Sequence, residues 1–205
     1  MSVKIIFFSL LGAVSSVYSA TQTAPPPAAP PSLPRLNIAQ PLTADLSSEI
    51  SPTLSPDGRW FLFASNKSGN YDLWVRPSTG GMPYQITNAP SDEYDPVWSP
   101  DGKRIYFTSN WNDPAGDIFV LNFATSELRG SKAYRQKPLI RAPGAQSFPS
   151  VSHNGRFLAF QEGEGENAAI VLFDLRKQTR RRLTSDGFLQ PRFSPVDDRI
   201  LCIAV

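Results

Sequence analysis

The stretch Ser55–Ser65 reads SPDGRWFLFAS, a turn followed by an apolar strand, and a near copy, SPDGKRIYFTS, occupies residues 99–109. Two weaker copies begin at Ser152 and Ser194. The turn dipeptides at residues 57, 101, 154 and 197 are 44, 53 and 43 residues apart. A repeat of this period decides the fold, because each copy is one supersecondary unit that needs its neighbours to bury its apolar faces.

The repeated turn is built from residues that bend the backbone. Asp and Asn form side-chain hydrogen bonds to nearby backbone groups, Gly adopts a positive φ without steric cost, and Pro presets φ near −65°. A second apolar strand recurs at 71–77, 116–122 and 169–175, and a more polar strand closes each unit. The sequence therefore predicts four-stranded antiparallel units whose turn is structural rather than catalytic.

A single four-stranded unit would leave both faces of its sheet in water, so the units must stack. Radial stacking of such sheets is the β-propeller, whose blades repeat every 40–45 residues or so. We predict an all-β fold with an incomplete ring. Its parts are an orphan strand in 36–48, complete repeats at 49–90, 91–144 and 145–187, and a truncated repeat at 188–205.

The first 20 residues have the layout of a secretory signal peptide. Lys4 precedes an apolar run from Ile5 to Val14, and small residues follow. An uncleaved anchor is the alternative. Residues 21–35 are rich in proline and predict an extended linker, with a docking peptide as the alternative. We therefore expect a periplasmic or secreted protein that meets the membrane only indirectly or through an uncleaved signal segment.

Composition narrows the function classes. The single cysteine, Cys202, excludes an intramolecular disulfide, and the net charge of +2 together with export argues against nucleic acid as a partner. The sequence has no Gly-x-Ser-x-Gly elbow, and its one histidine, His153, falls in a turn. A triad or a zinc site needs more ligands than this. We predict no catalytic residue, no metal and no cofactor.

The sequence from Pro96 to Ser109, followed by Asp117-Ile118-Phe119-Val120, resembles the WD-like repeat of TolB-type β-propellers. The resemblance implies an exported propeller related to a component of the Tol-Pal system of bacterial envelopes. TolB also has an α/β domain ahead of its propeller, whereas this chain has the proline-rich segment there. The same repeat resembles propellers of prolyl oligopeptidase-like peptidases and of polysaccharide lyases, so the fold does not decide the function.

Binding candidates come from two features of the repeat. Inner strands line the channel of a propeller, and the residue before each repeated proline changes from unit to unit. These channel-facing candidates are Ser51, Asp95, Phe148 and Gln190. Basic residues gather where the outer rim is expected, and they suit an acidic partner or simply guard edge strands. The rim candidates are Arg129, Lys132, Arg135, Lys137, Arg180, Arg181 and Arg182.

These features predict an exported, non-enzymatic propeller that acts as a protein-interaction scaffold in the cell envelope. The alternative is a propeller domain or fragment associated with a prolyl oligopeptidase-like hydrolase or a polysaccharide lyase. We also expect the last apolar strand to be an open edge, so a homodimer could complete the ring by strand exchange.

Overall fold

The computed structural model describes residues 5–8, 47–129 and 134–205, without the side chains of 5–8, 127 and 129. It contains three four-stranded antiparallel sheets, each ordered as in the chain. The first has β2 (Glu49–Leu54), β3 (Trp60–Ser65), β4 (Asp72–Pro77) and β5 (Tyr84–Gln85). The second has β6 (Glu93–Trp98), β7 (Arg104–Ser109), β8 (Asp117–Asn122) and β9 (Gln136–Ile140). The third has β10 (Gln146–Val151), β11 (Phe157–Glu162), β12 (Ala169–Asp174) and β13 (Thr179–Arg182).

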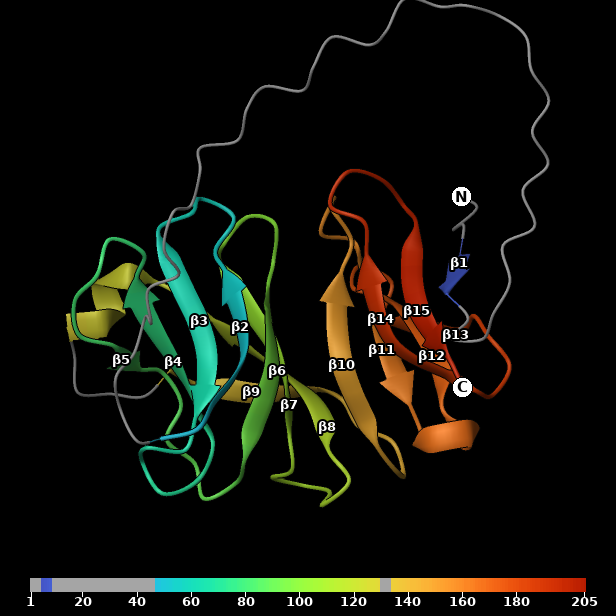
Figure 1. Cartoon of the computed structure of the whole chain (residues 1–205), viewed down its shortest axis with the longest axis horizontal. Coiled ribbons are helices and arrows are strands. Elements are labelled where there is room, and N and C mark those ends of the chain that lie inside the picture. Colours follow the sequence, from blue (N-terminus) through green and yellow to red (C-terminus); the bar gives the residue numbers. More distant parts are fainter. Residues whose placement is uncertain (1–4, 9–46, 130–133) are drawn as a thin grey trace, which may run out of the picture. The chain divides into compact units, whose positions relative to one another are not determined.

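The sheets follow one another as blades, and their inner strands β2, β6, β10 and β14 (Phe188–Phe193) are successive neighbours (Figure 1). Short 3-10 helices, η1 (Thr125–Arg129) and η2 (Gly165–Asn167), are the helical elements of the described residues. None of those residues belongs to a helix long and apolar enough to cross a membrane. The all-β propeller architecture with an incomplete ring is confirmed.

The turn chemistry that the sequence predicts is present in the first three blades. The Ser55 hydroxyl donates to Asp57 Oδ1 at 2.6 Å and accepts the backbone N–H of Trp60 at 2.9 Å. Ser99 donates to Asp101 at 2.5 Å, and Ser152 donates to Asn154 at 2.9 Å. The serine is buried in all three turns, so it satisfies backbone and side-chain groups at once.

Consecutive turns also pack on each other. A Cβ placed on Gly102 would lie 3.9 Å from Pro56 Cδ, and one on Gly155 would lie 3.6 Å from Pro100 Cδ. The third turn has His153 in the place of proline, and His153 Nδ1 lies 3.7 Å from an Asp198 carboxylate oxygen in the fourth turn. A polar contact thus replaces the proline–glycine contact, which gives the only histidine a structural explanation.

The core lies between blades. One apolar cluster joins the first two blades and includes Leu62 and Phe107, and a second joins the next two and includes Tyr106 and Phe160. Tyr106 and Phe107 are adjacent and point to opposite faces, so the second blade is buried on both sides. A third cluster packs the third blade against β14 and β15 (Ile200–Ala204) and contains Cys202.

In the full chain, the edge that the sequence predicts to be open is covered by a strand from the predicted signal segment. β15 pairs with β14 on one side and, in parallel, with β1 (Ile5–Phe8) on the other. The unpaired N–H and C=O groups of an apolar edge strand accept any extended segment that reaches them, which explains the pairing. The predicted linker (21–35) and most of the predicted orphan strand (36–46) lie outside the described residues.

Candidate functional site

The four channel-facing candidates share an unusual backbone conformation. Ser51, Asp95, Phe148 and Gln190 have φ values of 51°, 52°, 53° and 49°. Positive φ is uncommon for residues other than glycine, and it costs about 1–2 kcal/mol at an ordinary side chain. The strand register shifts around each of the four, between Ile50/Thr53, Tyr94/Val97, Ser147/Ser150 and Leu189/Arg192. Each candidate therefore sits at a β-bulge of an inner strand.

A bulge breaks the ladder locally and changes the direction of a side chain. Its recurrence in four blades, each time just before the repeated proline, shows that the repeat itself maintains the strained conformation. Strain of this kind persists where the surroundings enforce it, and it is common at binding sites. The sequence located these positions, although it did not reveal their conformation.

The strain gives a testable difference between two neighbouring positions of β14. Gln190→Val puts a β-branched side chain at a positive φ and should lower the free energy of unfolding by about 1–2 kcal/mol. Gln190→Gly should not lower it. Arg192→Val, at an exposed position of the same strand where valine has a high strand propensity, is the control. Equal stability of the two valine variants in urea denaturation would contradict the strain.

The inner strands enclose a cavity of about 470 Å³. We call it the channel-side cavity. Ser51 and Asp95 line it, together with His153 and Arg192. Phe148 and Gln190 are absent from the lining, although their neighbours on the same strands contribute to it. The structure thus brings two of the four candidates together and adds Arg192, a residue that the sequence pattern did not single out.

Asp95 is the electrostatic centre of the cavity. Its Oδ1 accepts a hydrogen bond from the Ser51 hydroxyl at 3.2 Å, across the boundary between two blades. Burial raises the pKa of the Asp95 carboxyl, while the Ser51 bond, the Arg192 charge and a backbone hydrogen bond from Phe148 oppose the rise. The half-buried carboxylate of Asp95 and the exposed guanidinium of Arg192, which belong to different blades, therefore share one concave surface. Such a surface can bind a polar or zwitterionic group.

The polar groups of the channel-side cavity can hydrogen-bond a ligand. His153 Nδ1 lies 3.7 Å from an Asp198 carboxylate oxygen, and the Ser51 hydroxyl donates to Asp95. No group of three or more His, Cys, Asp or Glu side chains in the described part of the chain is arranged to hold a metal ion. Ser51 and Asp95 supply a hydroxyl and a carboxylate, which serve as hydrogen-bond partners for a ligand.

Glu93 is a buried acid between the first two blades. Glu93 Oε1 accepts hydrogen bonds from Ser91 at 2.6 Å and Ser109 at 3.2 Å, whereas Oε2 has no partner. Burial raises the pKa of Glu93 to about 7, and the charge of Asp72 adds to the rise. At the same position the first blade begins with Glu49, and the blades after the second begin with Gln146 and Phe188. An acid therefore occurs here in two of the four blades, and of the two acids only Glu93 is fully buried.

The basic rim is only partly described. Lys132 and the side chain of Arg129 lie outside the described residues. Lys137 pairs with Val120, while Arg180 and Arg182 pair with Phe173 and Val171. These apolar partners belong to the cluster between the second and third blades, so the three cations surround the outer end of that interface. Arg181 pairs with Leu172 and lies on the opposite face.

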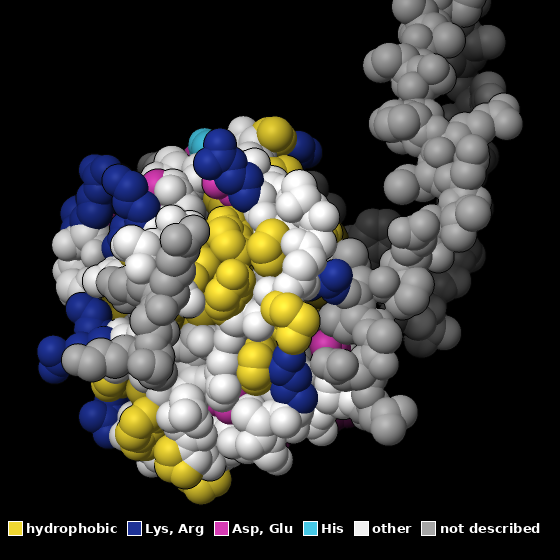
Figure 2. Space-filling view, turned by 90° about the vertical axis from the view of Figure 1, so that its left-hand side faces the viewer, with side chains coloured by type: hydrophobic (Ala, Val, Ile, Leu, Met, Phe, Trp, Pro, Cys, Tyr) yellow, Lys and Arg dark blue, Asp and Glu magenta, His cyan; other side chains and the backbone are white. Residues whose placement is uncertain are grey.

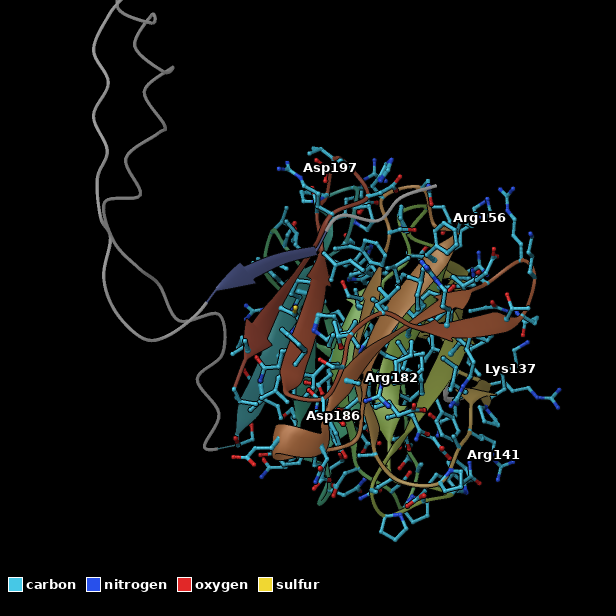
Figure 3. All side chains as sticks on the ribbon, turned by 90° about the vertical axis from the view of Figure 1, so that its right-hand side faces the viewer. Lys137, Arg141, Arg156, Arg182, Asp186 and Asp197 are labelled. Carbon is cyan, nitrogen blue, oxygen red and sulfur yellow. The ribbon has the colours of Figure 1, made fainter. Side chains whose placement is uncertain are left out.

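Acidic neighbours neutralise part of this rim. Arg180 lies 2.9 Å from Glu162, and Arg182 pairs with Asp186. Figure 3 shows Lys137 projecting away from the ribbon. Arg135 and Lys137 line a small hollow together with Val120 and Asn122 of β8. The rim thus combines internally paired arginines with exposed cations that a partner can reach.

Comparisons agree with this architecture. A family model, the TolB beta propeller domain, matches residues 39–204. The chain therefore belongs to the TolB β-propeller family. A search of curated protein sequences finds no significant match.

Solved structures extend the likeness to several kinds of propeller. A TolB structure from Agrobacterium tumefaciens is 25% identical with a TM-score of 0.59, covering 71% of this chain and 50% of its own. Oligogalacturonate lyase from Vibrio parahaemolyticus is 13% identical with a TM-score of 0.57, covering 76% and 46%. A puromycin-hydrolyzing peptidase from Mycobacterium tuberculosis is 17% identical with a TM-score of 0.56, covering 75% and 25%. The chain spans half or less of each, and the two enzymes share the fold alone.

Proposed function

We propose that this chain is an exported, non-enzymatic binding module of the cell envelope that holds a protein partner at its channel-side cavity. The observation that carries the proposal is that Ser51, Asp95 and Arg192, from three blades, line one concave surface. Ser51 and Asp95 are strained bulge residues of their inner strands. The basic rim offers a second, weaker contact for an acidic face of the partner.

Family membership and the N-terminal sequence support the proposal. The family model that matches residues 39–204 is that of the TolB propeller, and the first 20 residues have the charge and hydropathy pattern of a signal peptide. A propeller suits binding, because its inner strands display side chains from successive blades on one rigid surface.

Export is tested by fractionating cells that express the full chain. We expect the protein in the periplasm or the medium, shortened at its N-terminus. A version lacking residues 2–20 should stay in the cytoplasm. If the full chain stays uncleaved in the cytoplasm, as the shortened version does, the export part of the proposal is contradicted.

A turnover assay separates the binding module from the enzyme-associated alternative. The purified chain is incubated with proline-containing chromogenic peptides and with oligogalacturonides. We expect product formation at the rate seen in buffer. Turnover that disappears in Asp95→Asn, a carboxylate of the channel-side cavity, would overturn the proposal in favour of an enzyme.

A further inference from the structure

A second cavity, of about 530 Å³, lies between the Ser-Pro-Asp-Gly turns of the first two blades. Trp60, Trp98 and Phe123 line it, and we call it the aromatic cleft. The ring centroids of Trp98 and Phe123 are 4.8 Å apart at 86°, and those of Trp60 and Phe123 are 6.2 Å apart at 70°. Tyr134 stacks on Phe123 at 5.6 Å. Edge-to-face packing therefore holds these rings in place before any ligand arrives.

The repeat does not require aromatic residues at these positions. Phe123 donates its N–H to the carbonyl of Lys103, and Leu175 of the next blade makes the same bond to Arg156. Trp98 is the last residue of the inner strand β6, Trp60 is the first residue of the second strand β3, and Phe123 directly follows the third strand β8. At the next interface these positions hold Val151, Arg104 and Leu175, and at the third interface Phe193 and Phe157 hold the first two of them. The repeat therefore does not fix the residue type, and the pair of tryptophans is particular to the first interface.

Exposed hydrophobic side chains continue from the cleft onto the surface. The Tyr84 ring lies 6.3 Å from that of Trp60 and is 39% exposed, and Met82 is 80% exposed. Figure 2 shows hydrophobic side chains gathered on the side of the chain that carries β5 and η1. Contiguous exposed apolar surface is typical of interaction sites.

Two carboxylates stand at the mouth of the cleft. Asp57 and Asp101 belong to its lining, and each uses Oδ1 for the hydrogen bonds of its own turn. The pKa of Asp57 is lowered, first by the hydrogen bond from Ser55, and the pKa of Asp101 is lowered in the same way by Ser99. Both groups are therefore ionised at neutral pH. Asp57 Oδ2 lies 3.8 Å from Arg59 Nε, so Asp101 Oδ2 is the better partner for a basic side chain of a ligand.

The walls of the cleft combine apolar and polar side chains. Pro56, Pro100 and the three aromatic side chains supply apolar surface, and the hydroxyls of Thr125 and Ser126 lie beside the two carboxylates. The apolar part suits ring-containing side chains of a ligand. A proline-rich segment has few backbone N–H groups, adopts the polyproline II conformation readily, and packs its rings on aromatic grooves.

We propose that the aromatic cleft binds a proline-rich segment of a partner polypeptide, with a basic residue of that segment placed beside Asp101. The cleft adjoins the channel-side cavity, because Trp98 and the two turn prolines line both of them. Trp60, Phe123 and Asp101 line the cleft alone, so the proposal does not depend on what the channel-side cavity binds.

The test uses a fluorescein-labelled peptide, Ala-Pro-Pro-Leu-Pro-Pro-Arg-Pro, titrated with the purified full chain and followed by fluorescence anisotropy. We expect saturable binding, and at least about tenfold weaker binding to Trp60→Leu, which keeps apolar volume but removes the ring face. Ser126→Arg, at an exposed position of the lining, should also weaken it, because it blocks the mouth without touching the core. The matched control is Ser185→Arg, an exposed serine outside the lining.

Further arms identify the ligand chemistry. A peptide with alanine in place of every proline should not bind, and one with glutamine in place of arginine should bind several-fold more weakly. Asp95→Asn should leave peptide binding unchanged, so a failed channel-side site and a failed cleft can be told apart. The inference is overturned if the wild-type chain does not bind the peptide, if Trp60→Leu and Ser126→Arg bind like wild type, or if neutral oligosaccharides compete.

Discussion

Glu93→Gln should make the protein more stable than wild type by about 3 kcal/mol above pH 7. Burial, helped by the Asp72 charge, raises the pKa of Glu93 from 4.5 to about 7. Below pH 4.5 the carboxyl is protonated in both the folded and unfolded states. Between pH 4.5 and 7 the unfolded state releases the proton while the folded state keeps it, so the wild type loses stability as pH rises. Glutamine keeps the oxygen that Ser91 and Ser109 contact and removes the loss.

Urea denaturation from pH 5 to 8.5 measures this effect. The free energy of unfolding of the variant should lack the decline that the wild type shows between pH 5 and 7. Glu49→Gln is the matched control, because Glu49 begins β2 as Glu93 begins β6. It should leave the decline in place. A Glu93→Gln variant that is less stable than wild type at pH 8 would show that the buried carboxylate has a stabilising partner.

Phe107→Ala should lower the free energy of unfolding by about 3–5 kcal/mol. Phe107 is fully buried in the cluster between the first two blades, where its ring centroid lies 5.9 Å from that of Phe119. Removing the ring leaves a cavity between two packed sheets, and the second sheet cannot move inward without disturbing its packing against the third blade. The loss therefore reports on blade stacking.

Trp111→Ala is the control for this substitution. Trp111 is 52% exposed, so its removal should change stability by no more than about 0.5 kcal/mol. Denaturant unfolding followed by circular dichroism compares the two variants. A Phe107→Ala variant as stable as Trp111→Ala would mean that the blades do not pack as described.

The fold was predictable because its signals are local and repeated. Ser55, Ser99 and Ser152 make the turn that the motif predicts, and the apolar runs after the turns are strands buried on both faces. Family membership followed from the same residues. The pairing of β15 with β1 was not predictable, because an open edge does not specify in sequence which segment covers it.

The positions of two residues of the candidate site were predictable from the sequence, but the side chains that surround them were not. Variation before the repeated proline pointed to Ser51 and Asp95, which share the channel-side cavity. The place of Arg192 in the cavity and the burial of Glu93 were not predictable, because both depend on neighbours in other blades that only stacking brings close. The aromatic cleft was hidden for the same reason, since its rings come from separate strands and loops of two blades.

The most direct test of the proposed binding site is photocrosslinking in the native host. A photoreactive phenylalanine analogue replaces Thr53, which lines the channel-side cavity, or Trp111 as an exposed control outside it. We expect one discrete protein adduct from position 53, none from position 111, and loss of the adduct when Asp95→Asn and Arg192→Gln are added. An adduct from position 53 that survives both substitutions, or no adduct there at all, would contradict a partner held at the channel-side cavity.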